Sequence, residues 1–324
     1  MHRAMSRPPG RDIELTKFES DVRAGLTKAP QKELYSKYFY DGLGTALFEA
    51  ITLLPEYGLT RADMRLLRQH ARELPERLGN VSVVVELGSG SGEKALEILP
   101  HLVKARPITY CPIDVSAAAL TRCQRDLDHL HNLKIVPIKN SYIEGLAAAS
   151  QMRVAGTRVL VLFLGSSIGN FEPPFAETFL EALRGSLRKN DAFFVSADLV
   201  KGADQMFPAY DDEIGLTAAF NLNLLARINR ELGGTFDLKA FEHEARYNEH
   251  EQRIEMHLKS TVDQTAFVRD FTVSLKKGET IWTESSYKFR PEQVRAMAEQ
   301  ARFNTEVQWI DAEWPFAQTL LRVV

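Results

Sequence analysis

Short apolar runs alternate with helix-like segments along the middle of the chain, between residues 81 and 200. The runs are almost continuously apolar, as expected for strands that are buried on both faces of a sheet. They occupy residues 81–87, 107–113, 133–139, 158–164 and 191–198. Helices are expected between them near residues 92–103, 116–128 and 173–188. This alternation predicts an α/β fold with a doubly wound, mostly parallel sheet.

After residue 201 the pattern changes to a helical stretch followed by strands in which apolar and polar residues alternate. The helix is expected over residues 216–232, and the strands over 252–260, 271–275 and 280–289. In the first of these strands, the apolar side chains that share one face are Ile254, Met256 and Leu258. The segment KKGE predicts a hairpin turn between the last two strands, and so an antiparallel meander.

The end of the chain predicts a helix that begins at or just after Pro291, followed by two more β-like runs. We expect these runs to complete the first sheet as an antiparallel pair. The chain would then form two domains. A nucleotide-type domain would comprise residues 62–199 and 288–324, and an inserted α+β substrate domain would comprise residues 200–287 with a helical segment, 10–61.

The composition is ordinary for a globular protein, with 44% hydrophobic and 26% charged residues over 324 positions. A net charge of −3 provides no basic field for nucleic acid or a membrane surface. No apolar run approaches the roughly 18 residues of a membrane span. The start of the chain, residues 1–15, is basic but lacks the apolar segment of a secretory signal, and we expect it to be frayed. Cys111 and Cys123 lack the spacing of metal or redox motifs. We therefore expect a cytoplasmic monomer with reduced thiols and without a metal.

A glycine-rich loop, residues 87–94 (LGSGSGEK), separates the first apolar run from the first expected helix. Such a loop brings backbone N–H groups close to a ligand. Its glycines follow the pattern GxGxG, and Glu93 stands where a dinucleotide-binding loop has its third glycine. Glu86 ends the strand before the loop, and Asp114 ends the next strand, where it can accept both ribose hydroxyls. This arrangement is common in class I S-adenosylmethionine-dependent methyltransferases; a nicotinamide enzyme and a glycine turn without ligand are the alternatives.

Five longer motifs occur in order along the chain, at residues 38–63, 163–171, 209–221, 253–258 and 283–292. Together they closely resemble the histidine Nα-methyltransferases of ergothioneine biosynthesis, over essentially the whole chain from about residue 21. The resemblance implies a class I methyltransferase fold, S-adenosylmethionine as methyl donor, and trimethylation of L-histidine to hercynine. The same superfamily includes enzymes that methylate a prenylated tryptophan, so membership alone does not fix the substrate.

The resemblance also implies which residues hold the two ligands. Glu284 and Ser286 resemble the pair that holds the imidazole in that family. They are two residues apart on an expected strand, so both side chains point to one face, with Trp282 on the same side. A carboxylate can accept an imidazole N–H, and a hydroxyl can donate to or accept from the other nitrogen. The implied substrate-binding residues are Tyr57, Gly165, Asn170, Tyr210, Met256, Glu284 and Ser286. The implied methyl-donor contacts are Gly88, Ser89, Gly90, Lys94, Asp114, Ser141 and Tyr142.

Seen alone, these residues have ordinary explanations. Asn170 could cap a helix, Tyr142 could be a surface tyrosine, Met256 fits a core position, and Glu284 with Ser286 could face solvent. Their joint occurrence favours a binding site. One departure is Ser141, which stands where some members of the family have an acid that holds the adenine amine.

Methyl transfer needs a neutral amine about 3–3.5 Å from the methyl carbon. The motifs contain no strong base, so we expect the ammonium proton to leave through Tyr40, Asn170 or an ordered water. Tyr40 could also hold methylated intermediates by a cation–π contact. The alternatives are an enzyme acting on another aromatic amino acid such as tryptophan, against which a buried Glu284 argues, and a non-catalytic protein that binds the methyl donor.

Overall fold

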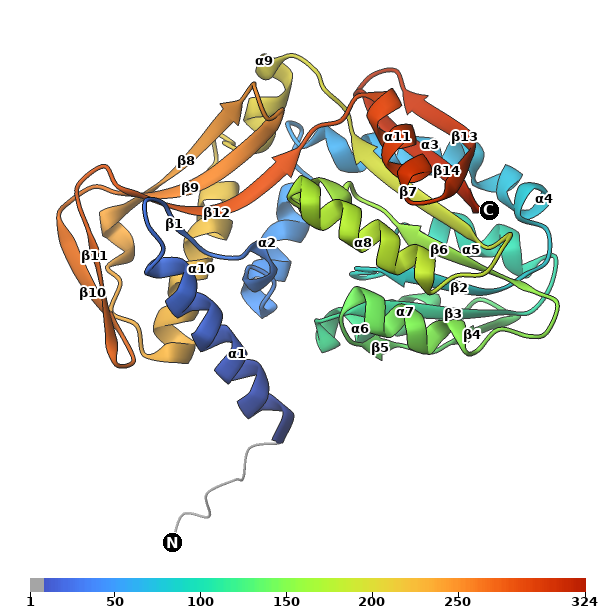
Figure 1. The fold of residues 1–324 in the computed structure, drawn as a ribbon, viewed down its shortest axis with the longest axis horizontal. Coiled ribbons are helices and arrows are strands. Elements are labelled where there is room, and N and C mark those ends of the chain that lie inside the picture. Colours follow the sequence, from blue (N-terminus) through green and yellow to red (C-terminus); the bar gives the residue numbers. More distant parts are fainter. Residues whose placement is uncertain (1–8) are drawn as a thin grey trace, which may run out of the picture. The chain divides into compact units, whose positions relative to one another are not determined.

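The computed structural model describes residues 9–324 (Figure 1). The chain divides into two compact units, and each is described by itself. The smaller unit consists of Met1–Glu56 and Ala203–Ser285, and the larger unit of Tyr57–Gly202 and Ser286–Val324. The start of the chain, residues 1–15, was expected to be frayed. Residues 1–8 of that stretch lie outside the described residues, and from Pro9 onward the chain is helical instead.

The larger unit is built on an eight-stranded sheet in the order β13-β14-β7-β6-β2-β3-β4, with β5 also beside β3. The central strands from β2 to β7 pair in parallel, and β14 runs antiparallel to both β7 and β13. The doubly wound, mostly parallel sheet with an antiparallel C-terminal pair is thereby confirmed. The strands are β2 (Val81–Leu87), β3 (Ile108–Asp114), β4 (Leu133–Ile135), β5 (Ile138–Lys139), β6 (Arg158–Phe163), β7 (Ala192–Asp198), β13 (Phe303–Asp311) and β14 (Phe316–Val323).

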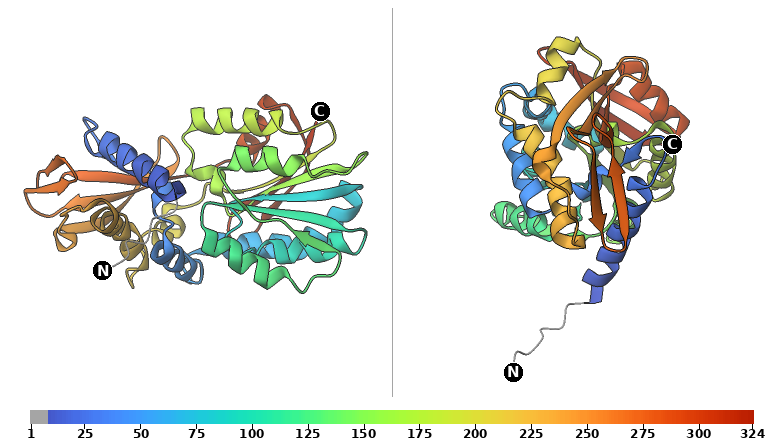
Figure 2. Two further views of the ribbon diagram at one scale, coloured as in Figure 1. Left: turned by 90° about the horizontal axis from the view of Figure 1, so that it is seen from below. Right: turned by 90° about the vertical axis from the view of Figure 1, so that its left-hand side faces the viewer.

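Helices cover both faces of this sheet (Figure 2). One core contains Val83 and Val85 of β2 together with side chains from α7 (Tyr142–Ser150), α8 (Pro173–Gly185) and α11 (Pro291–Gln300). The other core contains Val84 together with side chains from the helices on the opposite face. These are α3 (Gly58–His70), α4 (Leu74–Leu78), α5 (Ala95–Val103) and α6 (Ala117–Leu127). Burial on both faces explains why the strand sequences are continuously apolar.

The smaller unit contains a four-stranded sheet in the order β1-β12-β9-β8 and a separate β10-β11 pair (Figure 1). Helix α10 (Leu216–Leu232) packs on β8, β9 and α2, and its bounds are those expected from the sequence. The remaining helices are α1 (Pro9–Leu26), α2 (Gly42–Thr52) and α9 (Ala203–Met206). The strands are β1 (Lys32–Glu33), β8 (Phe241–Asn248), β9 (Arg253–Ser260), β10 (Gln264–Val268), β11 (Phe271–Leu275) and β12 (Thr280–Tyr287).

The hairpin that we expected across KKGE is wrong. A turn does form there, since Glu279 N donates to Lys276 O at 2.9 Å, but β11 and β12 belong to different sheets. Strand β11 pairs with β10, which the sequence analysis missed, and Ala266 lies opposite Val273. A two-residue connection places β10 beside β11, whereas β12 is enclosed between β1 and β9. The shorter loop closure favours the β10-β11 pairing.

Two other elements differ from expectation. The run 133–139 forms two short strands, β4 and β5, which both pair with β3. Strand β8 and helix α7 were not expected at all. None of the helices among residues 9–324 combines the length and apolarity that a membrane-crossing segment needs.

Candidate active site

The glycine loop lies between β2 and α5, and its three glycines all have positive φ angles. At Gly92, where φ is 80°, a Cβ atom would lie 2.6 Å from Cys123 Sγ, which leaves no room for a side chain. The chain therefore turns tightly against α6. The loop can direct its N–H groups toward a ligand, because its glycines allow a close backbone approach.

Asp114 ties the end of β3 to this loop. Its Oδ2 accepts a hydrogen bond from Gly90 N at 3.0 Å, and its Oδ1 accepts one from Ser116 N at 2.8 Å. A carboxylate has about four acceptor positions, so both oxygens retain capacity for hydroxyl donors. The structure thus brings together Asp114 and Gly90, two of the expected methyl-donor contacts.

Glu86 lies beneath the loop, at 3% exposure, and does not face solvent. The Tyr110 hydroxyl donates to its Oε2. Burial raises the pKa of Glu86 to about 7, and the hydrogen bond from Tyr110 opposes part of that shift. Burial also raises the pKa of Tyr110 well above its ordinary value. This pair supports the loop from inside the core.

Ser141 and Tyr142 are placed at the start of α7. Ser141 is exposed, and its hydroxyl donates to Glu144 Oε2 at 3.1 Å. The Tyr142 ring packs edge-on against Phe163, with centroids 5.5 Å apart. A Cβ atom at Gly88 would lie 3.1 Å from its hydroxyl, so Tyr142 borders the glycine loop. Burial raises the pKa of Tyr142 to about 12, which keeps the phenol neutral.

Asp63 of α3 brings two of the expected site residues together. It is fully buried, and its Oδ2 accepts from Gly165 N at 2.9 Å and lies 3.5 Å from Lys94 Nζ. Gln318 Nε2 donates to its Oδ1 at 2.6 Å. Asp63 was not among the expected site residues, although the sequence carries a signal for it. It lies four residues from both Leu59 and Leu67, on an otherwise apolar helix face.

The loop after β6 carries Gly165 and Asn170. Ser166 has a left-handed backbone with φ of 61°, and its hydroxyl accepts a hydrogen bond from Asp198 N at 2.8 Å. A 3₁₀ turn, Ser167–Asn170, follows. A Cβ atom at Gly169 would lie 2.8 Å from Tyr287 O, so this loop packs directly against the end of β12.

Ser286 is connected to a buried charge cluster that the sequence analysis did not anticipate. Lys288 Nζ donates to Ser286 Oγ at 2.8 Å and lies 3.0 Å from Asp198 Oδ2. Lys201 Nζ lies 2.6 Å from Asp198 Oδ1, which also accepts from Trp314 Nε1 at 2.9 Å. Burial opposes ionisation of Asp198, but the two lysines prevail and lower its pKa.

In the smaller unit, Trp282 lies two residues before Glu284 on β12. Its indole Nε1 donates to the backbone O of Glu284 at 2.9 Å. The ring stacks with His257 at 6.0 Å between centroids, and Arg253 Cζ lies 4.4 Å from its centroid. Trp282 is therefore held between two side chains of β9, and it fixes the backbone that carries Glu284.

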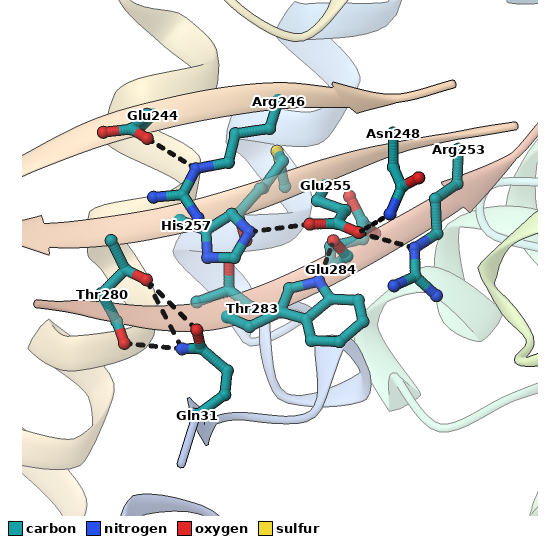
Figure 3. Close-up of polar contacts among 12 residues, drawn as sticks. Gln31, Glu244, Arg246, Asn248, Arg253, Glu255, His257, Thr280, Thr283 and Glu284 are labelled. Atoms are coloured by element: carbon teal, nitrogen blue, oxygen red, sulfur yellow. Dashed lines mark hydrogen bonds and ion pairs between the residues drawn. The ribbon is translucent and has the colours of Figure 1, made fainter. Parts of the chain in front are cut away.

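Glu255 is the centre of a polar cluster on the same stretch of β9 (Figure 3). Its Oε1 accepts from Arg253 Nε at 2.7 Å and from Asn248 Nδ2 at 3.1 Å. His257 Nε2 lies 3.2 Å from its Oε2. Burial lowers the pKa of His257, the adjacent carboxylate opposes that shift, and the ring is neutral at neutral pH.

Of the other expected residues of the smaller unit, Tyr210 and Met256 are buried and Tyr40 is half-buried. Tyr210 O accepts from His243 Nε2 at 2.7 Å, and His243 Nδ1 accepts from Asn221 Nδ2 at 2.9 Å. Met256 is 2% exposed, as its core position predicted. The Tyr40 ring packs edge-on against two phenylalanines, with centroid distances of 5.6 Å to Phe48 and 5.8 Å to Phe220. Tyr57 lies in the larger unit, just before α3.

Comparison with known proteins gives consistent matches over nearly the whole chain. The model of a family described as histidine-specific, SAM-dependent methyltransferase matches residues 18–323. Histidine N-alpha-methyltransferase of Mycolicibacterium smegmatis is 40% identical over 304 residues, 93% of each chain. The protein of the same name from Mycobacterium tuberculosis is 39% identical over 317 residues, 96% of each chain. Ergothioneine biosynthesis protein 1 of Neurospora crassa is 30% identical over 230 residues, 69% of this chain and 26% of that protein.

Proposed function

The chain belongs to the family of histidine-specific, S-adenosylmethionine-dependent methyltransferases, and from this premise we propose that it methylates the α-amine of L-histidine. Three successive transfers would give Nα,Nα,Nα-trimethylhistidine (hercynine), a step of ergothioneine biosynthesis. The observation that best supports histidine as substrate is the placement of Glu284 and Ser286 two residues apart on β12. An acceptor and a hydroxyl on one strand face match the two nitrogens of an imidazole.

The residues around the glycine loop fit S-adenosylmethionine. Ser89 Oγ is buried and has no hydrogen-bond partner among the described residues, which is unusual unless a ligand completes the site. Asp114 would accept the ribose hydroxyls, Lys94 would face the carboxylate of the methionine moiety, and Tyr142 would contact the adenine. When bound, S-adenosylmethionine supplies a methyl group made electrophilic by its sulfonium.

The head of the amino acid requires neutral hydrogen-bonding groups rather than a strong base. In our proposal Asn170 and Tyr210 hold the α-carboxylate and the amine, with Tyr57 and the Gly165 backbone beside them. The amine must lose its proton before it can attack, and Tyr40 or Asn170 would pass that proton to water. The aromatic surroundings of Tyr40 suit retention of methylated intermediates, through cation–π contacts worth about 0.5–2 kcal/mol.

Other parts of the interpretation stay predictions. We assign methyl-donor binding to the larger unit and much of the substrate recognition to the smaller unit. Action as a cytoplasmic monomer stays a prediction. A tryptophan-like substrate is disfavoured, since a carboxylate at Glu284 would lose solvation against an indole without gaining a partner. A non-catalytic role would leave the amino-acid site without purpose.

The test uses Glu284→Gln, with Glu255→Gln as the matched control. Both substitutions neutralise a glutamate in the same sheet, but we place only Glu284 against the imidazole. Glutamine keeps an acceptor oxygen but loses the charge. A hydrogen bond to a charged group is worth about 1.5–3 kcal/mol and a neutral one about 0.5–1.5 kcal/mol, so kcat/KM for histidine should fall about 5- to 15-fold in Glu284→Gln. Release of S-adenosylhomocysteine gives the rate. A wild-type enzyme that leaves histidine unmodified would refute the function, and equal losses in both variants would refute the role of Glu284.

The proton route is tested separately with Tyr40→Phe, which keeps the ring and removes the hydroxyl. If Tyr40 passes the proton, this variant should methylate more slowly in every round, as followed by the masses of mono-, di- and trimethylated histidine over time. A time course unchanged for all three products would exclude the hydroxyl from the mechanism.

A further inference from the structure

Lys288 is a fully buried lysine that directly contacts a residue of the proposed imidazole site. Its Nζ donates to Ser286 Oγ at 2.8 Å and lies 3.0 Å from Asp198 Oδ2. Its side chain is 0% exposed, and that of Asp198 is 1% exposed. A buried ammonium needs compensation by hydrogen bonds and opposite charge, so its position on Ser286 is a strong constraint on the hydroxyl.

Two buried lysines contact Asp198 in this cluster. Lys201 Nζ is also buried, lies 2.6 Å from Asp198 Oδ1, and donates to Leu199 O at 2.6 Å. Lys201 would by itself neutralise Asp198. A second buried lysine raises the electrostatic cost. Lys288 also contacts Ser286 Oγ, and this contact is how it can act on the proposed imidazole site.

A serine hydroxyl has one proton to donate and two lone pairs that can accept, whereas an ammonium can only donate. Lys288 therefore occupies an acceptor position of Ser286 and turns the hydroxyl proton away from itself. A neutral imidazole has one unprotonated nitrogen that accepts such a proton. An imidazolium has two N–H donors, and one of them would have to approach an oxygen that already faces a cation.

We propose that Lys288 is a positioning residue that makes Ser286 a hydrogen-bond donor, so that the enzyme selects histidine with a neutral imidazole. The inference rests on the proposed function, because it takes Ser286 as a contact of the imidazole. A hydroxyl can either donate to or accept from an imidazole nitrogen, and the inference assigns the donor role to Ser286. Glu284 would then accept the single N–H of the neutral ring.

Charged groups face Ser286 from three elements. On β7 and after it lie Asp198, whose pKa is lowered, and Lys201, whose pKa burial lowers to about 8. From the start of α8, Glu172 Oε2 accepts from the Tyr287 hydroxyl at 2.6 Å, and on β12 itself lies Glu284, which favours an imidazolium. Lys288 opposes that preference. The imidazole of the substrate, with a pKa of about 6.5, changes most between about pH 5.5 and 7.5, and a comparison of two substrates on the same enzyme removes the contribution of Lys201.

The experiment compares L-histidine with 1,2,4-triazol-3-ylalanine, whose ring has similar nitrogens but stays unprotonated over this range. The ratio of kcat/KM for the two substrates cancels the ionisation of the α-amine and of the enzyme. For the wild type, the histidine-to-triazole ratio should fall about tenfold from pH 7.5 to 5.5, following the neutral fraction of imidazole. A ratio that stays constant would overturn the inference.

Lys288→Met and Lys201→Met form a matched pair, because each leaves Asp198 with one buried lysine. Lys288→Met should bind the imidazolium as well as the neutral ring. Its histidine-to-triazole ratio of kcat/KM should therefore change by less than about threefold between pH 7.5 and 5.5, whereas that of Lys201→Met should still fall tenfold. A tenfold fall in Lys288→Met would contradict the proposal. A thermal shift with S-adenosylhomocysteine shows whether each variant is folded. If Lys288→Met does not fold, the pH dependence of the wild-type ratio tests the selection of a neutral imidazole. No methylation of histidine at pH 7.5 would overturn the proposed function and this inference together, whereas methylation with a flat ratio overturns the inference alone.

Discussion

Asp63→Asn tests whether one buried carboxylate organises the region around Gly165 and Lys94. The substitution keeps the shape of the side chain and removes its charge. Asp63 Oδ2 accepts from Gly165 N at 2.9 Å, and Oδ1 accepts from Gln318 Nε2 at 2.6 Å. An asparagine offers a single oxygen, so one of these two donors must face an NH2 group.

The cost can be worked out from the partners. If the asparagine oxygen stays with Gly165, its NH2 group faces Gln318 Nε2. Gln318 can turn its Oε1, which is buried without a hydrogen-bond partner among the described residues, toward that NH2 group. Turning breaks the bond that Gln318 Nε2 makes to Asp63 O at 2.8 Å. Gly165 and Gln318 then each exchange a hydrogen bond to a carboxylate for a neutral one, at about 1 kcal/mol each. Losing the bond to Asp63 O costs about 1 kcal/mol more, so we expect about 3 kcal/mol in all.

Urea denaturation of the wild type and the variant measures this difference in the free energy of unfolding. Affinity for S-adenosylhomocysteine should fall severalfold as well, since Lys94 loses its carboxylate neighbour at 3.5 Å. Glu97→Gln is the control. Its ion-pair partner Arg68 has a side chain that is 64% exposed, so the pair should contribute less than about 1 kcal/mol. A loss below about 1 kcal/mol in Asp63→Asn would refute the organising role of this carboxylate.

Two further predictions concern the glycine loop and the acid beneath it. Gly92→Ala should lower the free energy of unfolding by about 2–5 kcal/mol, because of the positive φ at this position and the clash of the new Cβ with Cys123. Combining it with Cys123→Ala should recover the part of this loss that comes from the clash, and a double-mutant cycle in urea measures the recovery. Glu86 has a pKa of about 7 in the folded enzyme, above the roughly 4.3 of an unfolded chain, so the folded state binds the proton more tightly and the wild type loses stability as pH rises from about 4.5 through 7. Each pKa unit corresponds to about 1.36 kcal/mol, so the free energy of unfolding of Glu86→Gln should rise by about 3 kcal/mol relative to the wild type over that pH interval. Plots of unfolding free energy against pH that stay parallel for the two proteins would contradict the burial of a protonated acid.

The sequence was most informative where local pattern and burial agree. Continuous apolar runs identified the strands of the larger sheet, since helices cover both faces. The hairpin across KKGE failed for a non-local reason, because the partners of β12 are β1 and β9. Helix α7 was missed because its sequence, YIEGLAAAS, consists of small and apolar residues without a clear amphipathic period.

The glycine loop was recognisable from its motif, and the buried charges were not. Asp114 lies at a strand end that a known arrangement marks as functional. Asp63, Asp198 and Lys288 become significant only through partners that are distant in sequence, such as Gln318 for Asp63 and Ser286 with Asp198 for Lys288. No spacing rule predicts such a cluster, because the fold and not the local pattern creates it.

The most direct test of the central claim offers the enzyme S-adenosylmethionine and each of the twenty amino acids, and reads the products by mass. Our account predicts that histidine alone gains methyl groups, up to three, and that tryptophan and tyrosine remain unmodified. Unmodified histidine beside methylated tryptophan would contradict it.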